Sequence, residues 1–459
     1  MEKQQTASQA DKMGVMPIGK LLCNMAIPMI ISMLVQALYN IVDSIFVAQI
    51  SEDALTAVSM AFPVQNLMIA VASGIGVGMN ANLSRSLGEK NQQMADRAAM
   101  QGFILNLCGY VLFLLFGLFG TGLFLKVQTD SQSILTAATA YIQICCFCSV
   151  GLFCQFSFER MLQATGRTFY TMITQATGAI INVIMDPILI FGLFGAPKLG
   201  IAGAALATVF GQIVAALLAL AYNHKKNDDI HLKAKNLKPD PTMMKRILMI
   251  GFPSILMISI GSVMNFCMNK ILIAFTSTAV AVFGVYFKLQ SFIMMPVFGL
   301  NNAMVPIVAF NFGAGNRARI LKTVKYCVIF AVTIMLLGCA VFQIWPHMLL
   351  KLFNASDSMM EIGCTMLRIA SISYIFAGFC IVVGSFFQAL GRSVYSLVVS
   401  VGRQLVVLVP VAYLLSKMGS LTLVWWAIPI AEIASVTLSI IFLRKVIGIL
   451  PKEEKAEEV

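Results

Sequence analysis

The chain repeats itself at a constant shift of 225 positions, and this internal duplication limits the folds open to it. Identical residues recur without a gap from Pro28 onward, in the pairs Pro28 and Pro253, Asn40 and Asn265, Gln65 and Gln290, Gly74 and Gly299, Gly88 and Gly313, Asn91 and Asn316, Gln163 and Gln388, and Tyr170 and Tyr395. Both copies are strongly apolar. A duplicated hydrophobic unit of this size is typical of membrane transporters built from two similar lobes.

The composition supports a membrane location. Of the 459 residues, 59% are hydrophobic and only 11% are charged, against roughly 25% charged residues in soluble domains. Apolar runs long enough to cross a bilayer of about 30 Å recur along the chain. They cover residues 21–50, 56–83, 98–125, 134–158, 168–194, 201–222, 247–276, 279–310, 323–345, 364–387, 394–415 and 421–443. We therefore predict an all-α membrane protein with twelve transmembrane helices.

One long polar interruption divides the runs into two sets of six. We predict a cytoplasmic tail at 1–20, an N-terminal lobe at 21–222, a cytoplasmic linker at 223–245, a C-terminal lobe at 246–447 and a second tail at 448–459. Because six is even, both halves enter the membrane from the same side. The two six-helix bundles should then be parallel repeats related by a pseudo-two-fold axis.

The net charge of +12 follows from membrane topology. Most Lys and Arg residues fall in segments on one side of the predicted spans, and the other side carries only Lys126, Lys198, Lys351 and Lys417. The positive-inside rule then places both termini in the cytoplasm. We expect a multi-pass protein of the bacterial inner membrane, bordered by lipid and without a nucleic-acid partner.

Acidic side chains within the apolar runs are the candidate functional residues, because a carboxylate in hydrocarbon costs a few kcal/mol even on lenient scales. Asp43 lies in the first run, where Gln36 and Asn40 share its helix face at spacings of seven and three residues. At the shift of 225, Met268 takes the place of Asp43. Only the first lobe therefore carries this acid for binding a cation.

A second acid lies in the fifth run. Asp186 follows Asn182 by four residues, so both project from one helix face. With Asp43, these side chains offer oxygen ligands for a hard cation or carboxyls that exchange a proton. The alternative is an acid that only holds helices together. Pro187 follows directly, and we expect it and Pro28, Pro63, Pro253, Pro296 and Pro306 to interrupt their helices.

The other charged residues within the runs leave their roles open. Glu159 either serves a cationic substrate or the coupling ion, or pairs with Arg160 or Arg167. Glu432, near the middle of the last run, has no polar stripe around it. Lys288 and Arg403 are candidate counter-ions in the second half.

Motifs for enzymatic chemistry are missing from the sequence. It contains no G-x-x-x-x-G-K-[ST] phosphate loop and no G-x-S-x-G nucleophile elbow. The three histidines lie in the linker or at a helix end, which argues against an intramembrane zinc protease. We expect neither catalytic residues nor a metal site nor a cofactor. An ion gradient is then the expected energy source.

Several ordered motifs resemble one known family. The segments are PMIISMLVQALYNIVD from Pro28 to Asp43, LGEKN from Leu87 to Asn91, QATGR from Gln163 to Arg167, NVIMDP from Asn182 to Pro187 and GIAGAALAT from Gly200 to Thr208. They resemble the multidrug and toxic compound extrusion (MATE) transporters, particularly the MepA-like branch, over residues 15–447. The resemblance implies a V-shaped pair of six-helix bundles. It also implies export of amphipathic, often cationic, compounds in exchange for H⁺ or Na⁺.

Residue roles follow from the same resemblance. It implies an ion site at Asp43, Asn182, Asp186 and Thr208, and matches Glu159 to an acid used in the MepA-like branch. We expect the substrate to contact Gln36, Asn40, Glu159, Gln65, Asn265, Gln290, Met33, Phe62, Met294 and Met295. No acid lies between Met249 and Thr276, so a second-lobe sodium site is not expected.

We expect a monomer that moves drugs by alternating access. The alternative is a related flippase for lipid-linked oligosaccharides, and a receptor or intramembrane enzyme is disfavoured.

Overall fold

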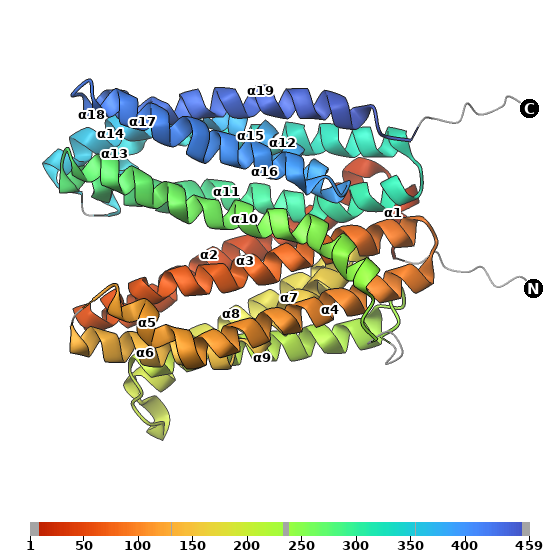
Figure 1. Cartoon of the computed structure of the whole chain (residues 1–459), viewed down its shortest axis with the longest axis horizontal. Coiled ribbons are helices and arrows are strands. Elements are labelled where there is room, and N and C mark those ends of the chain that lie inside the picture. The colour runs from red at the N-terminus through yellow and green to blue at the C-terminus, as the bar shows by residue number, and fades with distance from the viewer. Residues whose placement is uncertain (1–8, 130, 233–237, 354, 452–459) are drawn as a thin grey trace, which may run out of the picture.

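The computed structural model describes residues 9–129, 131–232, 238–353 and 355–451, and within them the chain is all helical (Figure 1). The first half contains α2 (Ile18–Ala48), α3 (Glu52–Gly88), α4 (Gln92–Leu115) continued by η1 (Phe116–Gly120) and α5 (Thr121–Lys126), α6 (Gln132–Phe147), α7 (Val150–Ala164), α8 (Thr168–Phe191) and α9 (Ile201–Lys226). The second half contains α10 (Pro241–Ile273), α11 (Ser277–Gly313), α12 (Arg317–Ile344), α14 (Asp357–Ser371), α15 (Tyr374–Ala389), α16 (Ser393–Val401) continued by η4 (Gly402–Leu408) and α17 (Val409–Ser416), α18 (Leu421–Trp425) and α19 (Ala427–Ile447). Short helices α1 (Lys12–Val15), η2 (Leu193–Gly195) and α13 (Pro346–Lys351) complete the described part.

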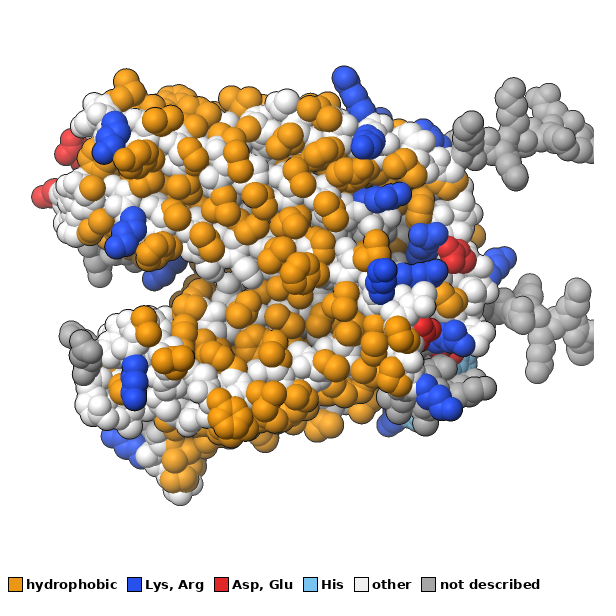
Figure 2. Space-filling model, in the orientation of Figure 1, with side chains coloured by type: hydrophobic (Ala, Val, Ile, Leu, Met, Phe, Trp, Pro, Cys, Tyr) orange, Lys and Arg blue, Asp and Glu red, His pale blue; other side chains and the backbone are white. Residues whose placement is uncertain are grey.

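The predicted twelve spans are confirmed. Among the described residues, 10 helices are long and apolar enough to cross a membrane, and two bent helix pairs bring the count to 12 when each pair is one span. A broad band of apolar side chains covers the face shown in Figure 2. Exposed Phe, Leu and Ile side chains of this kind are the surface that lipid would cover.

Helix starts repeat at the same shift as the sequence. α3 covers residues 52–88 and α11 covers residues 277–313, so their bounds differ by 225 at both ends. The side chains of Ser51 and Thr276 cap these two helices, and Asn91 and Asn316 cap α4 and α12. Each cap accepts a backbone N–H of the first helical turn that would otherwise lack a partner.

The two halves form two groups of helices that lie side by side. In Figure 1, α2–α9 and α10–α19 form separate layers, and both described chain ends lie at the same end of the molecule. The layers meet where α3 packs against α10 and α2 packs against α11. Figure 2 shows the layers separated by a hollow at the end away from the termini. Large aromatic residues fill each interior, among them Tyr141 and Phe153 in the first half and Trp425 and Tyr374 in the second.

Two repeat-related glycines allow α3 and α11 to touch near the terminal end. A Cβ on Gly88 would lie 1.9 Å from the carbonyl oxygen of Phe310, and one on Gly313 would lie 2.1 Å from that of Arg85. Both positions therefore require glycine, because the neighbouring atoms belong to backbone that cannot rotate away.

The fourth and tenth spans depart from the prediction. Each is broken, with a bend of 44° between α6 and α7 and of 51° between α14 and α15. The buried hydroxyls of Ser149 and Ser373 lie at the breaks and donate to the carbonyls of Cys146 and Ala370. These bonds satisfy carbonyls that the broken helix leaves without their usual donors.

The prediction that six prolines interrupt their helices is wrong. All six prolines lie inside continuous helices, including Pro28 in α2 and Pro187 in α8. Helices extend into both ends of the predicted linker at 223–245, whose residues 233–237 lie outside the described part of the chain. α9 continues to Lys226, with basic residues in its last turn, and α10 begins at Pro241 behind the Asp240 cap.

Candidate functional site

A polar stripe on α8 faces the interior of the first bundle, where its side chains bond to Glu159 on α7 and Thr208 on α9. The residues on the stripe are spaced three or four apart, as one helix face requires, and are Thr171, Thr174, Gln175, Gly178, Asn182 and Asp186. α2 packs against α8. Between them and α7 lies a cavity of about 100 Å³ whose lining includes Met33, Gln36, Tyr39, Glu159, Asn182 and Thr208. Five side chains predicted for ion or substrate roles therefore line one cavity together, and these are Met33, Gln36, Glu159, Asn182 and Thr208.

Asp43 and Asp186 lie next to this cavity and act on each other electrostatically. Asp186 is fully buried, and neither of its carboxylate oxygens has a hydrogen-bond donor. One carboxylate oxygen of Asp43 is also buried without a donor. Among the described residues neither acid forms an ion pair. Two carboxylates in this state need a proton or another cation, since an unpaired buried charge is strongly unfavourable.

Asn182 and Thr208 extend the same oxygen-rich region. The side-chain amide of Asn182 donates to the hydroxyl of Thr208 across 3.2 Å. This bond orients the amide oxygen of Asn182, which is buried and has no donor of its own. With the two acids it makes four oxygens lacking a donor, the kind of ligand that hard cations prefer. Among the described residues no cluster of three His, Cys, Asp or Glu side chains could hold a metal ion.

Glu159 is held by uncharged donors, and of the two alternatives left open by the sequence, pairing with Arg160 or Arg167 does not occur. Its side chain is 3% exposed. Its carboxylate accepts hydrogen bonds from Gln155 at 3.0 Å, Thr174 at 3.0 Å and Gln175 at 2.8 Å. Three amide and hydroxyl donors can hold a charged carboxylate in place without neutralising its charge.

The two arginines are occupied elsewhere. Arg167 pairs with Asp229 beyond the end of α9. Arg160 donates to Gln163 and Ser73 within the first half, and to the side-chain oxygen of Asn302 on α11 at 3.0 Å. Arg160 therefore ties the first half of the chain to the second at the wall of the cavity.

The other predicted substrate contacts of the first half are dispersed. Gln65 lines a smaller cavity beside Thr208 and donates to the hydroxyl of Tyr141. Asn40 is exposed, and the side chain of Phe62 is 61% exposed. Neither lines a cavity described here.

The second bundle holds its own cavity of about 190 Å³, lined by Asn265, Gln290 and Met294. Met295 is half-buried and does not line it. Arg403 and Glu432 lie in its wall and form an ion pair at 3.2 Å. Arg403 is thus a counter-ion, as the sequence suggested, and its partner is Glu432. Lys288 is exposed on α11.

Sequence reasoning missed several residues of the first cavity. Tyr39, Gln155, Arg160, Gln175 and Gln212 all line it. A signal existed, because Gln155 precedes Glu159 by four residues and the α8 stripe begins at Thr171, about three helical turns before Asn182. The sequence near Asn302 does not indicate that it lines this cavity, because its position there depends on how the two halves pack.

The fold and the site define a class of membrane transporter, with twelve spans in two helical bundles and, among the described residues, two acids inside one bundle that form no ion pair. The chain belongs to the MatE family, whose profile matches residues 28–188 and 253–414, one copy in each half. It is 27% identical over 420 residues to the multidrug export protein MepA of Staphylococcus haemolyticus, covering 90% of this chain and 91% of that protein.

Solved structures of the same kind superpose over almost the whole chain. A crystal structure of MATE in complex with MaL6 matches with a TM-score of 0.91 at 25% identity, covering 97% of this chain and 99% of the other. The outward-facing conformation of a multidrug resistance MATE family transporter of the MOP superfamily matches with a TM-score of 0.90 at 25% identity, covering 98% and 99%. The predicted transporter fold of twelve spans in two six-helix bundles is confirmed.

Proposed function

We propose that the protein is a secondary active multidrug efflux antiporter. It exports amphipathic, often cationic, compounds in exchange for H⁺ or Na⁺ by alternating access. The observation that carries this proposal is the pair of acids Asp186, which is fully buried, and Asp43, which is half-buried; among the described residues neither has a basic partner. The similarity to a multidrug export protein supports the substrate class.

Ion coupling follows from competition for one polar region. A proton or Na⁺ at Asp43 and Asp186 lowers the negative charge next to the cavity, which weakens the binding of a cationic substrate. By linkage, a bound substrate weakens the binding of the ion by the same factor. α2 and α8 carry these acids and also line the cavity. A change in their packing therefore reaches both ligands.

The cavity chemistry suits varied amphiphiles. Met33, Ile69 and Phe156 supply adaptable apolar walls, while Glu159 supplies a carboxylate held ready by its three donors. The cavity of about 100 Å³ is smaller than a typical drug site of roughly 300–1,000 Å³. Substrate entry therefore requires α2, α7 and α8 to separate.

The proposed orientation places the termini in the cytoplasm of a bacterial cell. Lys and Arg side chains gather near the terminal end in Figure 2, and the hollow between the layers opens at the other end. The positive-inside rule then makes the hollow face outward. The proposed working unit is a single chain, because each half supplies its own cavity.

The test is dye efflux from proteoliposomes loaded with ethidium, with a proton gradient and a sodium gradient imposed separately. One gradient should drive efflux in the wild-type protein, and Asp43→Asn should reduce that efflux at least tenfold. Asp357→Asn changes an exposed acid of the second bundle and should have no effect. Gradient-independent efflux, or full efflux by Asp43→Asn, would contradict the proposal.

The same preparation separates the flippase alternative. A pyrophosphate-linked sugar requires a cationic cavity, whereas the first cavity contains Glu159 and one arginine already engaged by Gln163, Ser73 and Asn302. Translocation of a fluorescent pyrophosphate lipid without ethidium efflux would favour the flippase.

A further inference from the structure

The cavity of the second bundle is the internal-repeat copy of the cavity in the first bundle. Residues that line one correspond, at the shift of 225, to residues that line the other, as in Gln36 and Gly261, Ile69 and Met294, and Leu152 and Ala377. The second cavity measures about 190 Å³ and the first about 100 Å³. The duplication thus gives each bundle a cavity at the same place in its fold.

The two copies differ in their charged groups. At the shift of 225, Arg403 takes the place of Gly178 and Glu432 takes the place of Ala207. Both replaced residues are uncharged, so this pair of charges belongs to the second cavity alone. Arg403 and Glu432 are the only charged residues that line it, and their charges cancel.

The acid pair beside the first cavity has no counterpart in the second bundle. Met268 corresponds to Asp43 and Val411 corresponds to Asp186. A compound that carries only positive charge therefore gains less in the second cavity than in the first. The neutral lining suits a compound that carries both signs of charge.

Arg403 has hydrogen-bond donors to spare. Its Nη1 donates to Oε2 of Glu432 at 3.2 Å, and no other acceptor for its guanidinium lies within the described part of the chain. A guanidinium has five N–H donors and binds carboxylates through two of them at once. The side chain is 32% exposed, so a dissolved carboxylate can reach its free edge while the bond to Glu432 stays intact.

Two acceptors in the same cavity lack donors. The atoms are Oε1 of Glu432 and the side-chain oxygen of Asn265, both buried without a hydrogen bond to any described residue. Unpaired buried acceptors are unfavourable, and a cationic nitrogen with N–H groups satisfies them. Phe283 and Phe287 add aromatic walls that favour an apolar body and a nearby cation.

The backbone around Arg403 departs from its repeat copy. Residues 402–408 form the π-helix η4, whereas the corresponding residues 177–183 lie inside the regular helix α8. π-Helical turns occur frequently at functional sites. Both Arg403 and Gln404 of this segment line the cavity, so the altered backbone coincides with the altered charge.

We propose that the second cavity binds amphipathic zwitterions, in which an apolar body joins a carboxylate to a cationic nitrogen. The carboxylate binds the free edge of Arg403, and the cationic nitrogen donates to Glu432 and Asn265. This inference rests on the proposed function and extends its substrates from cations to zwitterions. The cavity is smaller than the roughly 300–1,000 Å³ of typical drug sites, so α10 and α11 must separate to admit such a compound.

Dye binding to the purified protein in nanodiscs, with no ion gradient, tests the site. Rhodamine 110 carries a carboxylate beside its cationic amino groups, and rhodamine 123 is its methyl ester, so the pair differs only in the carboxylate. Fluorescence polarisation reports the affinity for each dye after subtraction of empty nanodiscs. The wild type should bind rhodamine 110.

Two variants remove the site in different ways. Arg403→Gln combined with Glu432→Gln keeps the cavity neutral and should weaken rhodamine 110 binding roughly tenfold or more, because hydrogen bonds to charged groups contribute that much. Rhodamine 123 binding should change less than threefold. Gly261→Leu fills the cavity without removing the ion pair, since only the side-chain oxygen of Gln404 lies within 4 Å of an added Cβ. It should also weaken rhodamine 110 binding.

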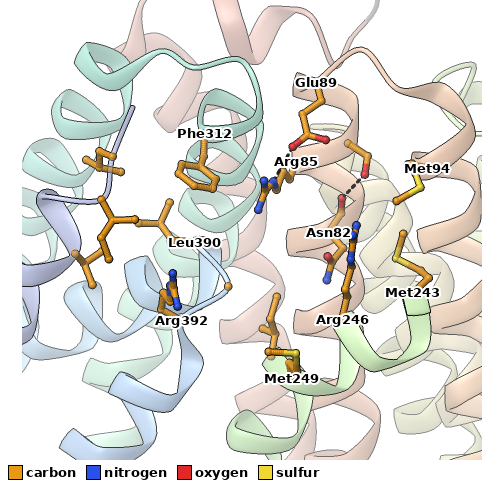
Figure 3. A pocket seen from close by; sticks show the side chains of 16 residues that line it. Asn82, Arg85, Glu89, Met94, Met243, Arg246, Met249, Phe312, Leu390 and Arg392 are labelled. Carbon is orange, nitrogen blue, oxygen red and sulfur yellow. Dashed lines mark hydrogen bonds and ion pairs between the residues drawn. The ribbon is translucent and has the colours of Figure 1, made fainter. Parts of the chain in front are cut away.

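A separate cavity supplies the control arginine. It measures about 600 Å³, lies at the terminal end and is lined by Arg85, Arg246 and Arg392. Figure 3 shows Arg85 and Arg246 on one side of its opening and Arg392 on the other. Arg392→Gln should leave the binding of both dyes unchanged. Gly284→Leu, at an exposed position outside the second cavity, should do the same.

Three results would overturn the proposal. The first is rhodamine 110 binding that is absent in the wild type or undiminished in either the double variant or Gly261→Leu. The second is an equal loss of both dyes in the double variant, which would show that the carboxylate is not recognised. The third is a loss in Arg392→Gln, which would place the dye in the terminal-end cavity. Failure of gradient-driven ethidium efflux would contradict the proposed function and leave these binding results standing.

Discussion

Arg403 and Glu432 form an ion pair at 3.2 Å inside the second bundle, where Glu432 is almost fully buried. The first bundle contains two acids, Asp43 and Asp186, that act on each other and lack any such partner. The two bundles share a fold but differ in charge balance. One holds an internally neutralised acid, whereas the acids of the other form no ion pair within the described part of the chain.

Glu432→Gln should destabilise the protein. The change leaves Arg403 without its counter-ion, and breaking a fully buried pair costs about 3–5 kcal/mol. Arg403 retains 32% side-chain exposure, so we expect about 1–3 kcal/mol here. Thermal unfolding in detergent measures the effect. The double variant Glu432→Gln with Arg403→Gln should recover part of the loss, and equal stability of wild type and Glu432→Gln would refute the pairing.

Gly88→Ala should prevent α3 and α11 from closing at the terminal end. The new Cβ would lie 1.9 Å from the carbonyl oxygen of Phe310, so the helices must separate. We expect transport to fall at least tenfold. Met249 lines the cavity beside this contact, so the cysteine of a Met249→Cys variant should react faster with a water-soluble maleimide. Gly284→Ala is the matched control on α11, because nothing lies within 4 Å of its added Cβ. Similar behaviour of the two variants would show that the close approach has no role.

Two adjacent asparagines on α11 should respond differently to replacement. Asn302 accepts a hydrogen bond from Arg160 across the boundary between the halves. Asn302→Leu should therefore cost about 1–2 kcal/mol in thermal unfolding, as expected for a partly exposed hydrogen bond to a charged group. The side-chain amide atoms of buried Asn301 lack partners, so Asn301→Leu should be neutral or stabilising. The reverse ranking would mean that the bond to Arg160 is unimportant.

Glu159→Gln should weaken export of cations more than export of neutral compounds. The substitution removes the negative charge from the cavity. It also turns one carboxylate oxygen, which accepts from Thr174 or Gln175, into an NH₂ group that cannot accept a hydrogen bond. We expect roughly tenfold slower ethidium efflux, equivalent to about 1.4 kcal/mol. Efflux of an uncharged dye should change less than threefold. A uniform loss for both dyes would point to a purely structural role.

The fold was largely predictable because the signals for it are periodic and long. The shift of 225 predicted two equivalent halves, and the bounds of α3 and α11 follow it at both ends. The breaks at Ser149 and Ser373 were not predicted. An apolar run containing a serine looks the same whether the helix continues or bends there, and the bend depends on packing around the hydroxyl.

The first cavity was partly predictable for the same reason. The helical spacing of Asn182 and Asp186 placed both on one helix face, and Thr208, which bonds to Asn182 from α9, came only from family resemblance. The donors around Glu159 come from two different helices, α7 and α8. Residue spacing within one helix carries no information on such contacts, so the neighbouring arginines looked like better partners.

The most direct test measures whether drug and ion compete at Asp43 and Asp186. Binding of tetraphenylphosphonium to the purified protein is measured by calorimetry over a range of pH and, separately, of Na⁺ concentration. In the wild type, affinity should fall 5- to 150-fold as the coupling ion saturates its site. In Asp43→Asn and Asp186→Asn this dependence should vanish while binding persists. Wild-type affinity that is unchanged by both pH and Na⁺, or an unaltered dependence in both variants, would contradict ion coupling through this acid pair.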